Sequence, residues 1–174
     1  MPNWCSNSVV FSADEPTLEK IRNMFADIQQ KQDAGGLYQL PSFAKSEKGV
    51  MTDIVIAQNR FSFETRWEPN LELMIETAQF YGASFVSRFS EMANGIYGEA
   101  SFSDKTLRLV TLDPEDFMAV RYDPSLKGYP WGEDIFEYQG DLLDHFLDRK
   151  IAMIPDWPTS SRQPENDTDL SAER

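Results

Sequence analysis

The chain has 174 residues, a length that suits a single domain able to bury a normal hydrophobic core. Its 29 acidic and 16 basic residues give a net charge of −13, which disfavours nucleic acid phosphates and anionic lipid surfaces as partners. Cys5 is the only cysteine, so no disulfide can form within the chain and a reducing compartment fits best. The longest aliphatic run, residues 54–57, is far too short to cross a membrane, and we expect a cytoplasmic protein.

The N-terminal part predicts a strand followed by a helix. Residues 7–12 alternate in the manner of a strand. The side chains expected on one of its faces are Asn7, Val9 and Phe11. Apolar residues at helical spacing follow as far as about Lys31, after two start signals at Ser12 and Asp14. Residues 37–51 are expected to form an irregular insertion.

The middle of the chain predicts two strands and a second helix. Residues 51–57 indicate a short strand, and residues 61–67 give the clearest alternation in the chain. The side chains expected on one face of that second strand are Phe61, Phe63, Thr65 and Trp67. Pro69 suits an early helical position, a helical stripe covers 71–81, and Gly82 suits the end of the helix.

A hairpin and a further strand are expected after this helix. Residues 84–89 and 96–102 alternate, and the Asn94-Gly95 pair between them is typical of hairpin turns. Residues 94–98 also resemble a phosphate-binding loop, but they precede a strand instead of opening a helix, so the hairpin explains them better. Residues 106–112 are expected to extend the sheet.

Beyond residue 113 the sequence changes to acids, prolines and aromatics. A third helix is expected from about Glu133 to Lys150, because apolar residues recur at helical spacing and its C-terminal end is basic. Residues 155–174 contain few apolar side chains and predict a disordered tail. The expected organisation is one domain over 1–154, with a C-terminal extension from about residue 113.

The order of these elements predicts an α+β fold. A β-α-β-β-α-β order is that of a ferredoxin-like split β-α-β sandwich, in which two helices cover one face of an antiparallel sheet. The extra C-terminal strand, the acidic loop and the last helix are additions to that core. Because this topology hosts many unrelated functions, it assigns none by itself.

Two tryptophan motifs carry a family resemblance. Residues 1–7, MPNWCSN, lead into the first strand, and residues 63–69, FETRWEP, lead into the second helix. Together with GIYGE at 95–99, these motifs resemble the YubB-like family of plasmid- and phage-borne proteins over roughly residues 1–103. The resemblance implies a ferredoxin-like domain and a mobile-element setting, and it carries over no catalytic residue. The family usually has a second Trp-Gly pair where this chain has NRFS at 59–62.

The acids are concentrated near the C-terminus. From Asp113 to Asp144 there are nine acids and two bases, a local net charge of −7. Such a segment is typical of a solvated face, and it also fits a surface that meets a basic partner. Tyr129 and Trp131, between glycines, proline and acids, are typical anchors of an interface. The partner-binding residues predicted from this segment are Glu115, Asp116, Asp123, Tyr129, Trp131, Glu133 and Asp134.

Other candidate sites give weaker signals. Asp141, His145 and Asp148 share one face of the expected third helix and could ligate a divalent metal, although any acidic helix gives this spacing readily. Cys5 has no nearby cation in sequence to lower its pKa, so we expect a small buried residue packed beside Trp4, not a nucleophile.

The sequence favours a non-enzymatic accessory protein of a mobile element. The expected partner is a host or element-encoded protein with a basic surface. The most specific version of this hypothesis is a counter-defence protein that mimics DNA. The alternatives are a small metal-dependent enzyme and a single-strand nucleic acid binder that stacks bases on Phe61, Phe63 and Trp67. No cofactor is expected, and a sheet edge leaves pairing with a second copy open.

Overall fold

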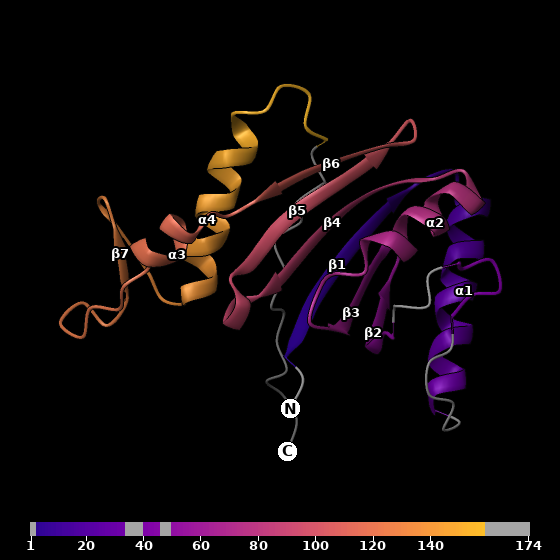
Figure 1. The fold of residues 1–174 in the computed structure, drawn as a ribbon, viewed down its shortest axis with the longest axis horizontal. Helices are drawn as coiled ribbons and strands as arrows, with labels where there is room; N and C mark the ends of the chain where they lie inside the picture. The colour runs from indigo at the N-terminus through magenta and orange to yellow at the C-terminus, as the bar shows by residue number, and fades with distance from the viewer. Residues whose placement is uncertain (1–2, 34–39, 46–49, 159–174) are drawn as a thin grey trace, which may run out of the picture.

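A computed structural model describes residues 3–33, 40–45 and 50–158 (Figure 1). The main strands are β1 Trp4–Ser12, β2 Thr52–Ala57, β3 Arg60–Arg66, β4 Ser84–Glu91, β5 Ile96–Ser103 and β6 Thr106–Thr111. The helices are α1 Glu15–Asp33, α2 Leu71–Tyr81, α3 Pro114–Ala119 and α4 Gln139–Ala152, and a small hairpin consists of β7 Tyr129–Trp131 and β8 Asp134–Phe136. No helix in these residues is long and apolar enough to cross a membrane.

The topology confirms the predicted ferredoxin-like fold. The six main strands form one antiparallel sheet in the order β2-β3-β1-β4-β5-β6. β3 pairs with both β1 and β2, so it lies between the two strands that α1 connects, which is the split β-α-β arrangement. β5 and β6 extend the sheet beyond β4, as the alternation over 106–112 predicts.

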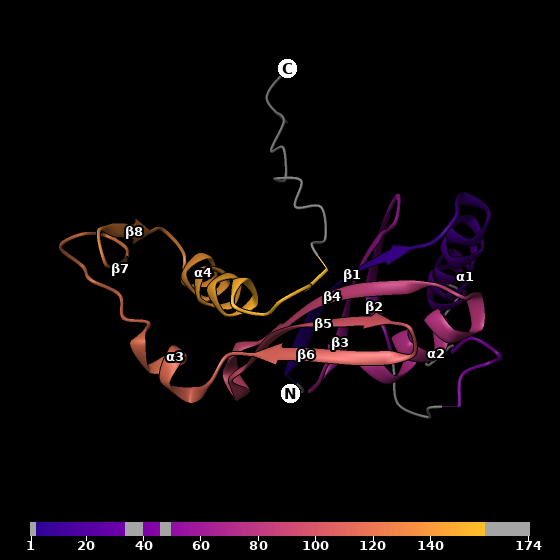
Figure 2. The ribbon, with the colours of Figure 1, turned by 90° about the horizontal axis from the view of Figure 1, so that it is seen from above.

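The main core lies between the sheet and the pair formed by α1 and α2. These two helices lie at one end of the molecule, and α3, α4, β7 and β8 lie at the other (Figures 1 and 2). Apart from Trp67, the residues expected on the inner face of β1 and β3 are buried, among them Phe11 and Phe61 with no exposed surface. The Phe25 ring of α1 stacks on Phe61 with 4.4 Å between ring centroids. Burying one such side chain stabilises the fold by roughly 1.5–3 kcal/mol.

The two tryptophans of the family motifs are more exposed than expected. β3 ends at Arg66, and Trp67 leaves the sheet with a φ of +70° and is 51% exposed. Its predicted place on the buried face was wrong because the chain turns after Thr65, whose hydroxyl donates to the Glu68 carbonyl at 2.8 Å. Trp4 is 42% exposed, and the Arg66 guanidinium lies 5.7 Å from its ring centroid. Trp4 was expected to pack at the entry to the first strand beside Cys5, and it does so only in part.

The helix boundaries follow only part of the predicted signals. α1 begins directly after Asp14, whose carboxylate accepts a hydrogen bond from the Thr17 amide at 3.0 Å, so Asp14 and not Ser12 caps the helix. Pro69 lies two residues before α2, outside the helix. Gly82 ends α2 in the left-handed conformation with a φ of +70°, as predicted.

The predicted hairpin of β4 and β5 is confirmed. Its turn is a short 3-10 segment, Met92–Asn94, followed by Gly95 with a φ of +66°. Further along β5, a side chain at position 98 would place its Cβ 2.5 Å from the Val110 carbonyl oxygen and 2.8 Å from the Phe89 ring. Gly98 is therefore required by the close approach of its neighbours.

The helix expected from Glu133 begins later. Residues 134–136 pair with 129–131 as the hairpin of β7 and β8, and α4 starts only at Gln139. The helix α3 was not predicted, although Pro114 at its start and the capping box of Asp113 and Asp116 are signals for it.

The helix α4 packs against the sheet on the face opposite to α1 and α2. A second hydrophobic cluster joins Tyr97 and Val110 of the sheet to Leu143 and Leu147 of α4. After α4 the described residues continue to 158, and Trp157 among them is only 9% exposed. The rest of the predicted tail, 159–174, lies outside the described residues, as do residues 34–36 and two parts of the predicted insertion, 37–39 and 46–49.

Candidate functional site: an exposed apolar and acidic surface

Residues 113–138 form a lobe outside the ferredoxin-like core. The lobe contains α3, β7 and β8 and packs on α4 (Figures 1 and 2). Its inward contacts are made by Phe117, Val120, Tyr129 and Phe136, which pack against the cluster beneath α4. Because the lobe is anchored through α4, its outer side chains are held in place relative to the sheet.

The hairpin of β7 and β8 holds one aromatic anchor. The Trp131 ring meets the Phe146 ring of α4 edge to face, with 4.6 Å between centroids, and Trp131 is still 37% exposed. Tyr129 is partly buried and packs on the Tyr122 ring at 5.3 Å. A rigid, half-exposed ring of this kind offers contact area with little entropy left to lose on binding.

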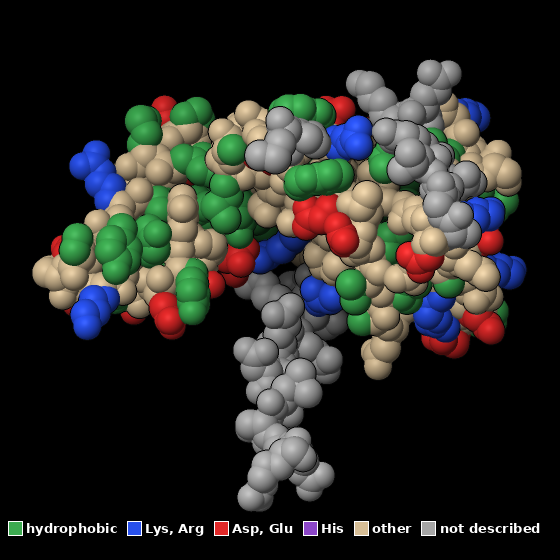
Figure 3. Space-filling model, turned by 90° about the horizontal axis from the view of Figure 1, so that it is seen from below, with side chains coloured by type: hydrophobic (Ala, Val, Ile, Leu, Met, Phe, Trp, Pro, Cys, Tyr) green, Lys and Arg blue, Asp and Glu red, His purple; other side chains and the backbone are tan. Residues whose placement is uncertain are grey.

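Large apolar side chains gather on the outside of the lobe. Figure 3 shows them on the left of that view, over the end of the molecule that holds α3, β7 and β8. The exposed large hydrophobic residues of this segment are Met118, Tyr122, Leu126, Trp131, Ile135 and Tyr138. Contiguous exposed apolar groups beside polar residues are typical of an interaction site.

Two of the predicted acidic binding residues are used within the molecule. The Asp116 carboxylate lies 2.6 Å from the Lys150 Nζ, which also pairs with Asp113, and it accepts the Asp113 amide at 2.7 Å. Asp123 accepts from the Ser125 amide and hydroxyl, and these hydrogen bonds lower its pKa. Asp116 and Asp123 therefore hold the lobe together.

The other predicted acids remain open to solvent. The carboxylates of Glu115, Glu133 and Asp134 are exposed, and none of them has a hydrogen bond or ion pair within the described part of the chain. Glu133 and Asp134 follow Trp131 directly, separated from it only by Gly132. We name this combination of the exposed apolar side chains with Glu115, Glu133 and Asp134 the lobe surface.

An ion-pair network that the sequence did not predict fixes α4 to the sheet. Arg88 of β4 pairs with Glu99 of β5 at 2.7 Å and with Asp144 of α4 at 3.0 Å, and it also pairs with Asp148. The Trp157 indole donates to the other carboxylate oxygen of Glu99 at 2.6 Å. The available signal was an arginine inside an alternating strand, on the face opposite to Phe85 and Phe89.

Burial and charge shift the pKa values of this network. Burial opposes the charge on Arg88, but the hydrogen bonds that Arg88 donates to Glu99 and Asp148 outweigh it and raise the pKa of Arg88. Burial also raises the pKa of Asp144 against the opposing charge of Arg88. The pKa of Tyr97 is raised by burial and by the Asp144 carboxylate. The network is therefore a mostly desolvated structural clamp.

In the structure, side chains of the predicted metal site make other contacts. Asp148 pairs with Arg88, and the His145 ring packs on Phe136 with 5.3 Å between centroids. Among the residues that the structure describes, no group of three or more histidine, cysteine or acidic side chains is placed to hold a metal ion.

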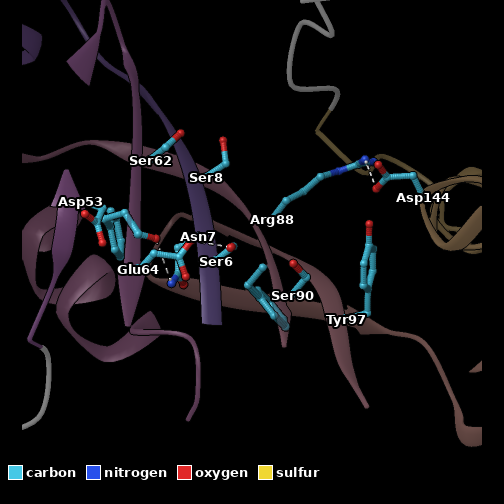
Figure 4. A pocket seen from close by; sticks show the side chains of 12 residues that line it. Ser6, Asn7, Ser8, Asp53, Ser62, Glu64, Arg88, Ser90, Tyr97 and Asp144 are labelled. Carbon is cyan, nitrogen blue, oxygen red and sulfur yellow. Dashed lines mark hydrogen bonds and ion pairs between the residues drawn. The ribbon is translucent and has the colours of Figure 1, made fainter. Parts of the chain in front are cut away.

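A polar groove lies beside this network, on the same face of the sheet as α4. Its volume is about 350 Å³. Figure 4 shows Asp53 and Glu64 on one side of it and Arg88 with Asp144 on the other. The hydroxyls between them belong to Ser6, Ser8, Ser62 and Ser90. The groove mixes both charges and hydroxyls. Phe63, Phe89 and Tyr97 also line it, but their side chains are buried and leave little ring surface on which a nucleic acid base could stack.

The remaining candidate residues, apart from Trp67, lie in the core. Cys5 has no exposed surface, and burial raises the pKa of its thiol to about 12, so it is no thiolate at neutral pH. Phe61 and Phe63 are buried beneath α1 and cannot stack on RNA bases, whereas Trp67 stands alone beyond the end of β3.

One comparison with known proteins finds a match. Residues 51–134 match a family described as a ferredoxin-like domain in Api92-like proteins. The match runs from the residue before β2 to the first residue of β8, so it includes α3 and most of the lobe. It therefore extends well past residue 103, where the resemblance found in the sequence ended. No curated protein and no solved structure matches the chain.

Proposed function

We propose that this protein is a non-enzymatic binding protein that uses the lobe surface to occupy a basic site on another protein. The observation that carries the proposal is the arrangement around Trp131. Its ring is seated on Phe146, is half-exposed, and is followed within three residues by the open carboxylates of Glu133 and Asp134. A rigid aromatic anchor with charged residues at its rim is the usual composition of a protein interface.

The charge of the chain supports the same partner chemistry. A net charge of −13 attracts basic surfaces over long distances and speeds their encounter. The most specific version of the proposal is that the carboxylates of the lobe surface occupy a partner site that normally binds nucleic acid phosphates, as expected of a counter-defence protein. The matched ferredoxin-like family and the motifs at 1–7 and 63–69 support a YubB-like protein of a plasmid or phage as its origin.

The proposal is tested by affinity capture with matched variants. Wild-type protein, Trp131→Ala and the double variant Glu133→Gln/Asp134→Asn are immobilised, and proteins retained from host lysate are identified. Trp67→Ala is the matched control, because Trp67 is also an exposed tryptophan but lies outside the lobe, directly after β3. A true partner is retained by wild type and Trp67→Ala and is lost with Trp131→Ala.

The magnitude and the salt dependence decide between versions of the proposal. Truncating an anchor costs about 2 kcal/mol or more, so we expect at least roughly 30-fold weaker binding for Trp131→Ala. The Glu133→Gln/Asp134→Asn variant should bind severalfold more weakly at low salt and approach wild type at high salt. Competition by short duplex DNA is expected if the partner site normally holds nucleic acid. A partner retained equally by all variants would contradict the proposal.

A further inference from the structure

The two edges of the six-stranded sheet are built differently. The β2 edge is interrupted by a bulge between Thr52 and Val55, where Asp53 has a φ of +52° and its carboxylate is exposed. A bulge and a charge are the usual means by which an edge strand is kept from pairing with another chain. This edge is therefore protected.

The β6 edge lacks these devices. β6 has six residues, without proline or bulge, in regular register with β5. Its single charged residue, Arg108, donates to the carbonyls of Pro155 and Asp156 and is thus held by the same molecule. Leu107 and Leu109 are 39% and 53% exposed on the other face. A regular edge with exposed leucines is suited to accept a further strand.

The hydrogen-bonding pattern shows which backbone groups face outward. The Leu112 amide donates to the Tyr97 carbonyl, so position 112 bonds inward to β5. Inward and outward bonding alternate along an antiparallel strand, so positions 106, 108 and 110 also bond to β5. The amides and carbonyls of Leu107, Leu109 and Thr111 therefore face away from the sheet, where no other strand of the described residues pairs with them.

We propose that the β6 edge pairs with the β6 edge of a second copy of this chain. In an antiparallel pair related by a two-fold axis, the outward positions meet when Leu109 lies opposite Leu109 of the other copy. Leu107 then lies opposite Thr111, and all three outward positions find backbone partners. The pairing joins the two six-stranded sheets into one.

Charge complementarity favours this register. With Leu109 at the centre, Lys105 in the turn before β6 of each copy comes near Asp113 after β6 of the other, since both lie four positions from the centre. Lys105 is exposed, and the Asp113 side chain is 65% exposed while it pairs with Lys150. Charges of unlike sign that approach at the two ends of a strand pair favour the pairing. Two such pairs form in the dimer.

The interface is small, so the association is weak. One strand pair buries much less than the roughly 1,200–2,000 Å² of a stable complex. Two copies that each carry a net charge of −13 also repel one another. We therefore expect a dissociation constant between roughly micromolar and submillimolar, and self-association that increases when salt screens the repulsion.

Crosslinking tests the register directly. Paired residues with facing backbone groups have Cα atoms about 5.5 Å apart, which a disulfide can span. Oxidised Leu109→Cys should form a covalent dimer, because Cys5 is buried and leaves the new thiol as the reactive one. Leu107→Cys is the matched control on the same face, since the two 107 positions lie on the order of 13 Å apart in this register. Equal crosslinking of both variants, or of neither, would overturn the proposal.

A charge exchange gives an independent test by sedimentation equilibrium. Lys105→Glu and Asp113→Lys each place like charges opposite one another in the homodimer, so each should self-associate more weakly than wild type. Mixing the two variants restores both opposite-charge pairs and should restore association. Lys127→Glu has the same charge change on a distant turn, and it should not restore association when mixed with Asp113→Lys. Thermal melts confirm that each variant is folded. A wild type that stays monomeric at submillimolar concentration would also refute the pairing.

Discussion

Arg88→Met tests whether the ion-pair network holds α4 on the sheet. Methionine keeps most of the apolar stem and removes only the guanidinium. The Glu99 side chain, 4% exposed, then keeps the Trp157 indole as its one remaining hydrogen-bond partner. Asp144 and Asp148 have side chains 46% and 31% exposed, so both can turn towards water after the change.

The expected loss follows from the buried member of the network. Removing one partner of a buried ion pair costs about 3–5 kcal/mol, because a desolvated charge is left without compensation. Solvent reaches 29% of the Arg88 side chain, which places the expected cost near the lower end, at about 3 kcal/mol. For a chain of this size that corresponds to a fall in Tm of roughly 6–12 °C.

Urea unfolding followed by far-UV circular dichroism measures the change. Arg60→Met is the matched control, because Arg60 lies on the same face of the sheet and, within the described residues, its side chain donates a single hydrogen bond, to the Ser8 hydroxyl at 3.4 Å. Its free energy of unfolding should change by less than about 1 kcal/mol. The double variant Arg88→Met/Glu99→Gln should recover much of the loss, since no buried charge remains. A loss for Arg88→Met as small as that of the control would refute the clamp.

Three further predictions concern the core. Cys5 should resist alkylation in the folded state and react once the protein is unfolded. Because burial raises its pKa to about 12, the free energy of unfolding should fall above roughly pH 9 by up to about 1.4 kcal/mol per pH unit. Cys5→Ala should remove this fall. Rapid alkylation of folded protein would contradict this. Gly98→Ala should cost at least about 2 kcal/mol in urea unfolding, whereas Gly140→Ala, with nothing within 4 Å of the new Cβ, should cost little. Trp157→Ala should cost about 3 kcal/mol and increase hydrogen exchange after α4; unchanged exchange would show that Trp157 does not fasten this segment.

The sheet could be predicted because one of its faces is buried. Burial under α1 and α2 selects apolar side chains at every second position, and this alternation is visible in the sequence of β1, β3 and β5. The short strands of the lobe have no such signal. Three residues, such as 134–136, cannot display a period, and their pairing with 129–131 depends on the turn at Gly132.

The candidate site was predictable in location but not in detail. The excess of acidic residues after Asp113 can be counted directly in the sequence. Which acids are neutralised depends on contacts between distant positions, as when Lys150 pairs with Asp113 and Asp116 or Arg88 with Asp144. The contact of the Trp131 ring with α4, a helix that begins eight residues later, likewise depends on how the chain folds.

Hydrogen exchange of the complex with its captured partner tests the central proposal most directly. The lobe surface predicts protection on binding in β7, β8 and α3, centred on Trp131, and no change in α1 or α2. Protection confined to the serine-lined groove of the sheet, or to α1 and α2, would show that the partner binds elsewhere and would contradict the account.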